Sequence, residues 1–150
     1  MKKIVVATGI ICAGLFISPA MAKDKVTTHQ VHFDKGTTGT TAKGQVKGYD
    51  TVNYKIGAKE GQYMRVSLES KKAYMNIFEP GKGVGDAAMF IGSTKGQSYT
   101  GNLPKSGTYT IQVYLMRNEA RRGRNTPLLF RYRLMRNLII KYAIICSFIL

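Results

Sequence analysis

The side chains best suited to binding chemistry lie in the second half of the chain. The run Ser106-Gly107-Thr108-Tyr109 offers a hydroxyl and a phenol, and Arg117 and Arg121 follow it. If the chain makes one helical turn there, arginines four residues apart lie on the same side of it. Two guanidinium groups so placed can donate forked hydrogen bonds to carboxylates. An internal ion pair with Glu119, or an ordinary solvated corner, explains the spacing equally well.

The residue types that catalysis needs are scattered. Ser106 is not part of a Gly-x-Ser-x-Gly elbow, and the two histidines, His29 and His32, stand near the beginning of the chain, where we interpret them as strand side chains. The acids fall in turns or at polar strand positions, and no cysteine or histidine cluster has metal-ligand spacing. We therefore expect no enzymatic activity, no metal and no cofactor.

Strand periodicity dominates the chain from Val26 onward. After the turn predicted by Pro104 and Gly107, apolar residues alternate with polar ones, and similar alternation covers residues 51–56 and 63–68. Glycine-rich turns separate about seven or eight short strands, and no window has a sustained helical period. The sequence predicts an all-β fold, an antiparallel β-sandwich.

The two ends of the chain differ from this pattern. Lys2, Lys3, an apolar run and Ala20-Met21-Ala22 predict a secretory signal peptide over residues 1–22. Cys12 would leave with it, so that Cys146 remains alone and no intramolecular disulfide can form. The expected domain covers residues 23–123.

Residues 124–150 form an atypical tail that contains no glycine and no acid. Phe130, Tyr132 and Leu134 alternate with arginines well enough to form a closing strand, but the composition differs from the rest of the chain. We hypothesise that a frameshift or an altered end replaced the natural last strand. The apolar run 138–150 is shorter than the roughly 20 residues that a membrane span needs, so no stable span is expected.

The formal net charge of +15 favours anionic partners, such as acidic proteins, lipid headgroups, cell-wall polymers or nucleic acid. A basic surface that only keeps a small secreted domain in solution is the alternative. Export and the lack of a strand motif combining basic and aromatic residues argue against nucleic acid.

Four short motifs carry a resemblance to a known family. They stand in the same order and at nearly the same spacing as in the periplasmic inhibitors of g-type (goose-type) lysozyme. The motifs are Lys47-Gly48-Tyr49-Asp50, Ala58-Lys59-Glu60-Gly61-Gln62, Leu103-Pro104-Lys105-Ser106-Gly107-Thr108-Tyr109 and Arg117-Asn118-Glu119-Ala120-Arg121-Arg122. The stretch from Gly61 to Tyr109 is also similar to the β-sandwich modules appended to secreted peptidases.

The resemblance implies a non-enzymatic periplasmic inhibitor that blocks the lysozyme's substrate cleft. In the family, a β-sandwich presents the Ser-Gly-x-Tyr loop and nearby arginines to that cleft. The implied lysozyme-binding residues are Tyr49, Ser106, Gly107, Tyr109, Arg117 and Arg121. The alternative is a non-catalytic module, like the peptidase appendages, that binds carbohydrate or a cell-wall polymer. The sequence leaves open the class of lysozyme and the oligomeric state.

Overall fold

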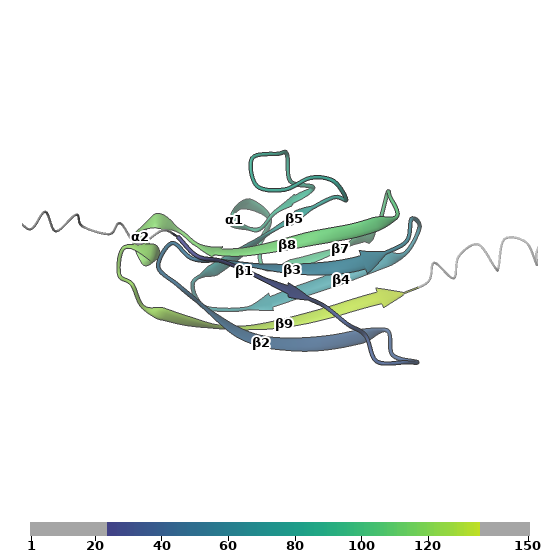
Figure 1. The fold of residues 1–150 in the computed structure, drawn as a ribbon, viewed down its shortest axis with the longest axis horizontal. Helices are drawn as coiled ribbons and strands as arrows, with labels where there is room; N and C mark the ends of the chain where they lie inside the picture. Colours follow the sequence, from purple (N-terminus) through teal and green to yellow (C-terminus); the bar gives the residue numbers. More distant parts are fainter. Residues whose placement is uncertain (1–23, 136–150) are drawn as a thin grey trace, which may run out of the picture.

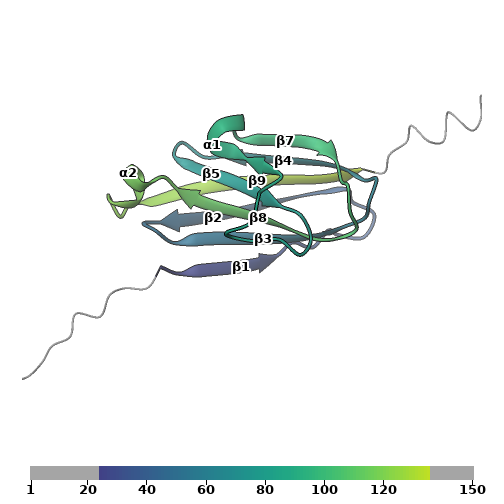
Figure 2. The same ribbon diagram turned by 90° about the horizontal axis from the view of Figure 1, so that it is seen from above.

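Two β-sheets stacked face to face build the domain (Figures 1 and 2). The computed structural model describes residues 24–135, so the predicted signal peptide, the segment 136–150 and Cys146 lie outside the described residues. In chain order the elements are β1 Val26–Gln30, β2 Gly39–Lys47, β3 Thr51–Ala58, β4 Tyr63–Glu69, β5 Ala73–Phe78, β6 Phe90–Ile91, α1 Gly92–Lys95, β7 Ser98–Asn102, β8 Gly107–Leu115, α2 Arg117–Ala120 and β9 Asn125–Met135.

The strand order is β1-β3-β8-β5-β6 in one sheet and β2-β9-β4-β7 in the other. Among the described residues only β1 pairs in parallel, with β3. The predicted all-β sandwich is confirmed, and its strands number slightly more than expected because β6 is a two-residue strand. The single-turn helices α1 and α2 have too few residues to produce a helical period in the sequence.

The core lies between the sheets and follows the predicted alternation. Along β8, every second residue from Tyr109 to Leu115 is buried, and the same rule holds in β3 and β4. Each large apolar side chain removed from water stabilises the fold by roughly 1.5–3 kcal/mol. His29 lies in β1 and stacks on Tyr54, with ring centroids 5.5 Å apart, whereas His32 follows the end of that strand.

The segment 125–135, expected to be atypical, is the strand β9, with β2 on one side and β4 on the other. Leu128, Phe130 and Tyr132 point into the core and are almost fully buried. The expected division after residue 123 is therefore not a structural boundary, since the strand beyond it completes the four-stranded sheet. The origin of this strand by a frameshift stays a hypothesis.

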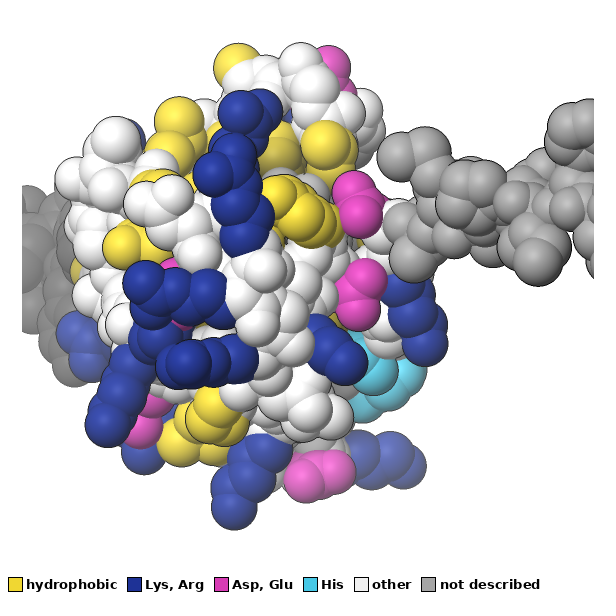
Figure 3. All heavy atoms as spheres, turned by 90° about the vertical axis from the view of Figure 1, so that its left-hand side faces the viewer, with side chains coloured by type: hydrophobic (Ala, Val, Ile, Leu, Met, Phe, Trp, Pro, Cys, Tyr) yellow, Lys and Arg dark blue, Asp and Glu magenta, His cyan; other side chains and the backbone are white. Residues whose placement is uncertain are grey.

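Loops gather at the two ends of the sandwich. The turns between β2 and β3 and between β4 and β5 meet α2 at one end, which faces the viewer in Figure 3. We call it the α2 end. The turns between β3 and β4 and between β7 and β8 meet at the opposite end. We call it the Ser106 end.

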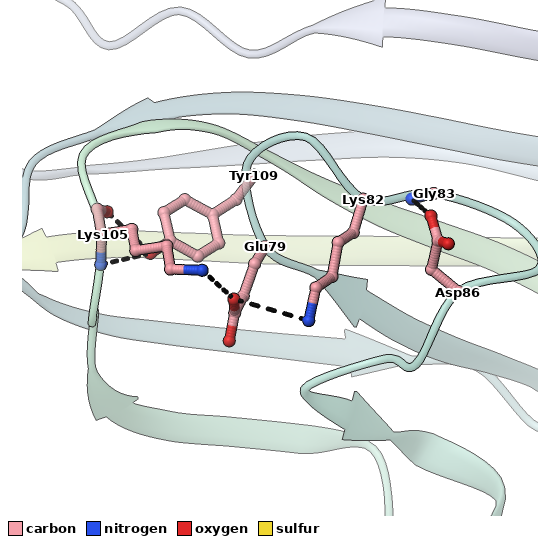
Figure 4. Close-up of polar contacts among 6 residues, drawn as sticks. All are labelled: Glu79, Lys82, Gly83, Asp86, Lys105 and Tyr109. Carbon is pink, nitrogen blue, oxygen red and sulfur yellow. Dashed lines mark hydrogen bonds and ion pairs between the residues drawn. The ribbon is translucent and has the colours of Figure 1, made fainter.

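The Ser106 end is held together by its own hydrogen bonds. The buried Tyr109 hydroxyl donates to the Lys105 carbonyl at 2.7 Å and accepts from the Lys105 amide at 3.2 Å (Figure 4). Ser106 Oγ accepts from the Glu60 amide at 2.9 Å. Gly107 has a φ of 141°, as its predicted role in the turn requires, and a Cβ there would lie 2.7 Å from Pro80 Cβ. The phenol thus fixes the turn from inside, in the manner of a tyrosine corner.

Replacing Tyr109 with phenylalanine removes both of these hydrogen bonds and keeps the buried ring. We expect the Tyr109→Phe variant to lose about 1–2 kcal/mol of unfolding free energy in urea denaturation. Tyr114→Phe is the matched control, because the Tyr114 hydroxyl has only a 3.5 Å contact with Asn76 Oδ1. Its loss should stay below about 0.5 kcal/mol. Equal stability of wild type and Tyr109→Phe would contradict this role for the phenol.

Candidate functional site

The six predicted site residues fall into two groups at opposite ends of the sandwich. Ser106, Gly107 and Tyr109 precede or begin β8, whereas α2 follows its last residue. Nine extended residues at about 3.3 Å each separate the two ends by roughly 30 Å. The expected single surface, with the arginines adjacent to the Ser-Gly-x-Tyr loop, is therefore corrected. Tyr109 is also 0% exposed, so its side chain contacts the inside of the loop and not solvent.

Arg117 and Arg121 do lie on one helical turn, as their spacing predicts. Arg117 begins α2, and the Arg121 amide donates to the Arg117 carbonyl at 3.0 Å. Both side chains are exposed, while Ala120 between them is only 3% exposed and packs into the core. The methyl group of Ala120 anchors the turn, so that the two guanidinium groups project from the same side of a fixed support.

Glu119 does not pair with either of these arginines. Its carboxylate contacts Lys72 Nζ at 2.6 Å and Arg122 at 3.1 Å. The hydrogen bond from Lys72, together with the charges of Lys72, Arg122 and Arg124, holds the pKa of Glu119 below its usual value, although partial desolvation opposes the shift. Within residues 24–135, Arg117 and Arg121 have no ion pair of their own. The internal ion pair considered from the spacing therefore involves Arg122 and not these two residues.

Tyr49 lies at the same end, in the turn between β2 and β3. The turn is closed by the Asp50 amide, which donates to the Lys47 carbonyl at 3.0 Å. Gly48 takes a φ of 58°, and a Cβ there would lie 3.8 Å from the Ala120 carbonyl, which puts the turn against α2. The Tyr49 side chain is 50% exposed, which decides between the two roles that the sequence left open in favour of an exposed turn aromatic.

Met116 is an exposed residue of this end that the sequence reasoning did not select. It immediately precedes α2, and 41% of its side chain is exposed. The alternation of β8 contained the signal, because the residue after the inward-facing Leu115 must point outward. Met, Tyr and Arg are all enriched at protein interfaces, and this end presents all three.

The charges of the two ends differ strongly. Around α2, cations outnumber acids, and Figure 3 shows Lys and Arg side chains gathered over this end. The cations in its loops and flanking positions are Lys25, Lys47, Lys71, Lys72, Arg117, Arg121, Arg122 and Arg124. At the Ser106 end, acids and lysines are balanced, and Glu79 contacts Lys105 at 3.1 Å and Lys82 at 3.8 Å (Figure 4). The hydrogen bond from Lys105 lowers the pKa of Glu79.

A hollow of about 850 Å³ adjoins the α2 end, beside the beginning of β9. Pro127, Leu128 and Leu129 contribute its apolar lining, and Lys72 and Arg124 stand at its border. A hollow of about 990 Å³ at the Ser106 end has a single charged lining residue among the described ones, Lys59. Apolar surface next to concentrated positive charge therefore occurs at the α2 end.

The described part of the chain holds neither a metal-binding cluster nor a membrane-spanning helix. Residues 24–135 contain no group of three or more His, Cys, Asp or Glu side chains that could hold a metal ion. They also contain no helix of the length and hydropathy that crossing a membrane requires.

Comparison with known proteins finds close relatives over most of the chain. The inhibitor of g-type lysozyme from Escherichia coli (strain K12) is 30% identical over 126 residues, which cover 83% of this chain and 92% of that protein. No family model matches the chain.

Solved structures of similar proteins point to the same kind of inhibitor. PliG from Aeromonas hydrophila is 42% identical with a TM-score of 0.71, covering 75% of this chain and all of that one. PliG from Salmonella Typhimurium is 28% identical with a TM-score of 0.58, covering 72% and 97%. Both are described as periplasmic lysozyme inhibitors of g-type lysozyme, and inhibitors of this kind are not enzymes. The chain belongs to the family of periplasmic inhibitors of g-type lysozyme.

Proposed function

We propose that this protein inhibits a g-type lysozyme in the periplasm by inserting its α2 end into the substrate cleft of the enzyme. The inhibitory activity is supported by the relatives, which are themselves named as inhibitors of g-type lysozyme. The observation that supports the surface is the pair Arg117 and Arg121, exposed on one helical turn and without an acidic partner in the described chain. Such a pair is suited to carboxylates supplied by another protein.

The chemistry of glycoside hydrolysis explains why cations would block it. Most glycosidases flank the scissile bond with a pair of carboxyl groups. A guanidinium group that enters such a cleft donates charge-assisted hydrogen bonds to a carboxylate and excludes both glycan and water. The positive charge around α2 would also speed encounter with an acidic cleft, because opposite fields steer association.

Tyr49 and Met116 would supply the apolar part of the contact. Their exposed side chains flank α2. Tyrosine and arginine are both enriched among the interface residues that dominate binding energy. A ring and a thioether packed around a guanidinium group keep water away from the ion pairs, and these pairs are stronger when water is excluded. The hollow lined by Pro127 and Leu129, which adjoins the same end, offers further apolar area.

Ser106, Gly107 and Tyr109 have a structural role in this proposal. The Ser106 hydroxyl already accepts a hydrogen bond from the Glu60 amide. The Tyr109 hydroxyl already donates to the Lys105 carbonyl and accepts from the Lys105 amide. The charges of that end are balanced, so it offers little attraction to an anionic cleft. Its role is to fix the start of β8, whose other end carries α2.

Removing either arginine should weaken inhibition strongly. We expect Arg117→Ala and Arg121→Ala each to cost about 2 kcal/mol of binding free energy, which is roughly thirtyfold in the inhibition constant. The measurement is inhibition of a g-type lysozyme on cell-wall suspensions, repeated with c-type and i-type enzymes to identify the class. Because the contact is electrostatic, added salt should weaken inhibition by wild type more than inhibition by the double variant Arg117→Ala/Arg121→Ala.

Ser106→Ala is the control from the opposite end and should inhibit within about twofold of wild type, since effects of surface substitutions away from a binding site are small. A loss in Ser106→Ala as large as that in Arg117→Ala would overturn the assignment of the α2 end. Binding to purified peptidoglycan without any effect on lysozyme would instead favour the alternative of a polymer-binding module.

The ring of Tyr49, more than its hydroxyl, should matter. We expect Tyr49→Ala to weaken inhibition by about tenfold, the amount that about 1.4 kcal/mol of lost contact represents, and Tyr49→Phe to retain most of it. Circular dichroism and thermal unfolding of both variants control for folding. If Tyr49→Ala inhibits as well as wild type, the turn between β2 and β3 lies outside the interface.

A further inference from the structure

A second group of arginines lies on the outer face of the four-stranded sheet, on the half nearer the Ser106 end. The strand registers bring outward-facing residues of neighbouring strands into two rows. One row reads Gly39, Arg133, Arg65 and Thr100 across β2, β9, β4 and β7, and the next reads Thr41, Arg131, Ser67 and Ser98. The centre of this face therefore holds three guanidinium groups surrounded by hydroxyls.

Two of these arginines oppose each other directly. Arg65 of β4 is the register partner of Arg133 of β9. Like charges at directly opposite positions in a sheet destabilise it. Arg131 has a partner, because it forms an ion pair with Glu69 on β4. Arg65 and Arg133 have neither an ion pair nor a side-chain hydrogen bond within residues 24–135.

The space at this position is hollow. A depression of about 420 Å³ is lined by Arg65, Ser67, Ser98, Arg131, Tyr132 and Arg133. The position next to Arg133 on β2 is Gly39, where a Cβ would lie 3.0 Å from the Tyr132 carbonyl oxygen and in ordinary contact, at 3.6 Å, with Arg133 Nε. The hydroxyls of Ser67 and Ser98 line the same depression.

We propose that this depression binds a phosphate group between Arg65 and Arg133. A phosphate monoester carries a charge close to −2 at neutral pH and three strong acceptor oxygens, so one group can neutralise both arginines. Guanidinium groups donate paired hydrogen bonds to phosphate, and the serine hydroxyls supply additional donors for the remaining oxygens. A single carboxylate carries half of that charge and only two oxygens, which makes it the poorer match for two opposed arginines and two hydroxyls.

This site is separate from the surface proposed for lysozyme. Arg65 and Arg133 lie within strands, on the outward side of the sheet, whereas Tyr49, Arg117 and Arg121 lie in turns at the α2 end. The phosphate could be free in solution or carried by a lipid headgroup. Free phosphate and a lipid phosphomonoester both present a terminal phosphate with three acceptor oxygens, and they can be told apart by experiment.

Thermal unfolding of the purified protein tests the site. With inorganic phosphate at neutral pH, we expect the wild-type Tm to rise by about 3 °C or more relative to sodium chloride of equal ionic strength. The double variant Arg65→Gln/Arg133→Gln should lose most of this difference and keep only the general stabilisation that phosphate gives any folded protein. It should also unfold at a higher temperature than wild type in low salt, because the opposed charges are gone. Lys55→Gln, on the outer face of the other sheet, is the matched control and should respond to phosphate like wild type.

Two results would overturn the proposal. One is no stabilisation of wild type by phosphate beyond that of chloride. The other is the same stabilisation in the double variant as in wild type, since the anion would then bind elsewhere, for example at the α2 end. Arg117→Ala/Arg121→Ala should keep the phosphate response, and Arg65→Gln/Arg133→Gln should keep lysozyme inhibition, so the two surfaces are tested independently.

Vesicles identify the source of the phosphate. Sedimentation of wild type, but not of the double variant, with vesicles that contain phosphatidic acid would assign the site to a lipid phosphomonoester. Stabilisation by inorganic phosphate without sedimentation would assign it to phosphate in solution. Both outcomes support the site and differ only in what carries the group.

Discussion

The rigid extension of β8 is the constraint on which the arrangement of this domain depends. The strand lies between β3 and β5, which pair with it from both sides, and its inward side chains from Tyr109 to Leu115 are buried. A strand held in this way can neither bend nor shorten, because both changes would break hydrogen bonds of two ladders. The turn before β8 and the helical turn after it are therefore kept apart, and each belongs to a different end of the molecule.

At the α2 end, a single acid organises the surplus of positive charge. Glu119 binds Lys72, which lies 47 residues earlier in the chain, and Arg122, three residues later. The bridge to Lys72 joins α2 to the turn before β5. Since the pKa of Glu119 is lowered in the folded protein, this contribution to stability is present above the unfolded pKa and is lost as the pH falls through the folded pKa. Glu119 thereby leaves Arg117 and Arg121 available to another molecule.

The sequence predicted features set by neighbouring residues better than contacts between residues far apart in the chain. Alternation along β3, β4 and β8 predicts strands and inward faces, because one side of each strand is buried, and the spacing of Arg117 and Arg121 predicts their common side. The pairing of Lys72 with Glu119 has no local signal, since it depends on where two turns meet after folding. The family resemblance implied a single surface for the arginines and the Ser106 turn, which are also close in sequence. Closeness in sequence is not closeness in space along an extended strand, so β8 carries the two groups to opposite ends.

The shape of each arginine group determines what it can bind. Arg117 and Arg121 project from a turn at the end of the sandwich, beside the exposed Tyr49 ring, so they can enter a concave surface and bring apolar contact with them. Arg65 and Arg133 lie on a sheet, where hydrogen-bonded strands hold their backbones at a fixed spacing and hydroxyls surround them. That support suits a small, highly charged group that fits between the two side chains. We therefore propose the same residue type for a protein cleft in one place and for a compact anion in the other. The strand β9 completes the fold with its core side chains and contributes Arg133 to the second site from its outer face.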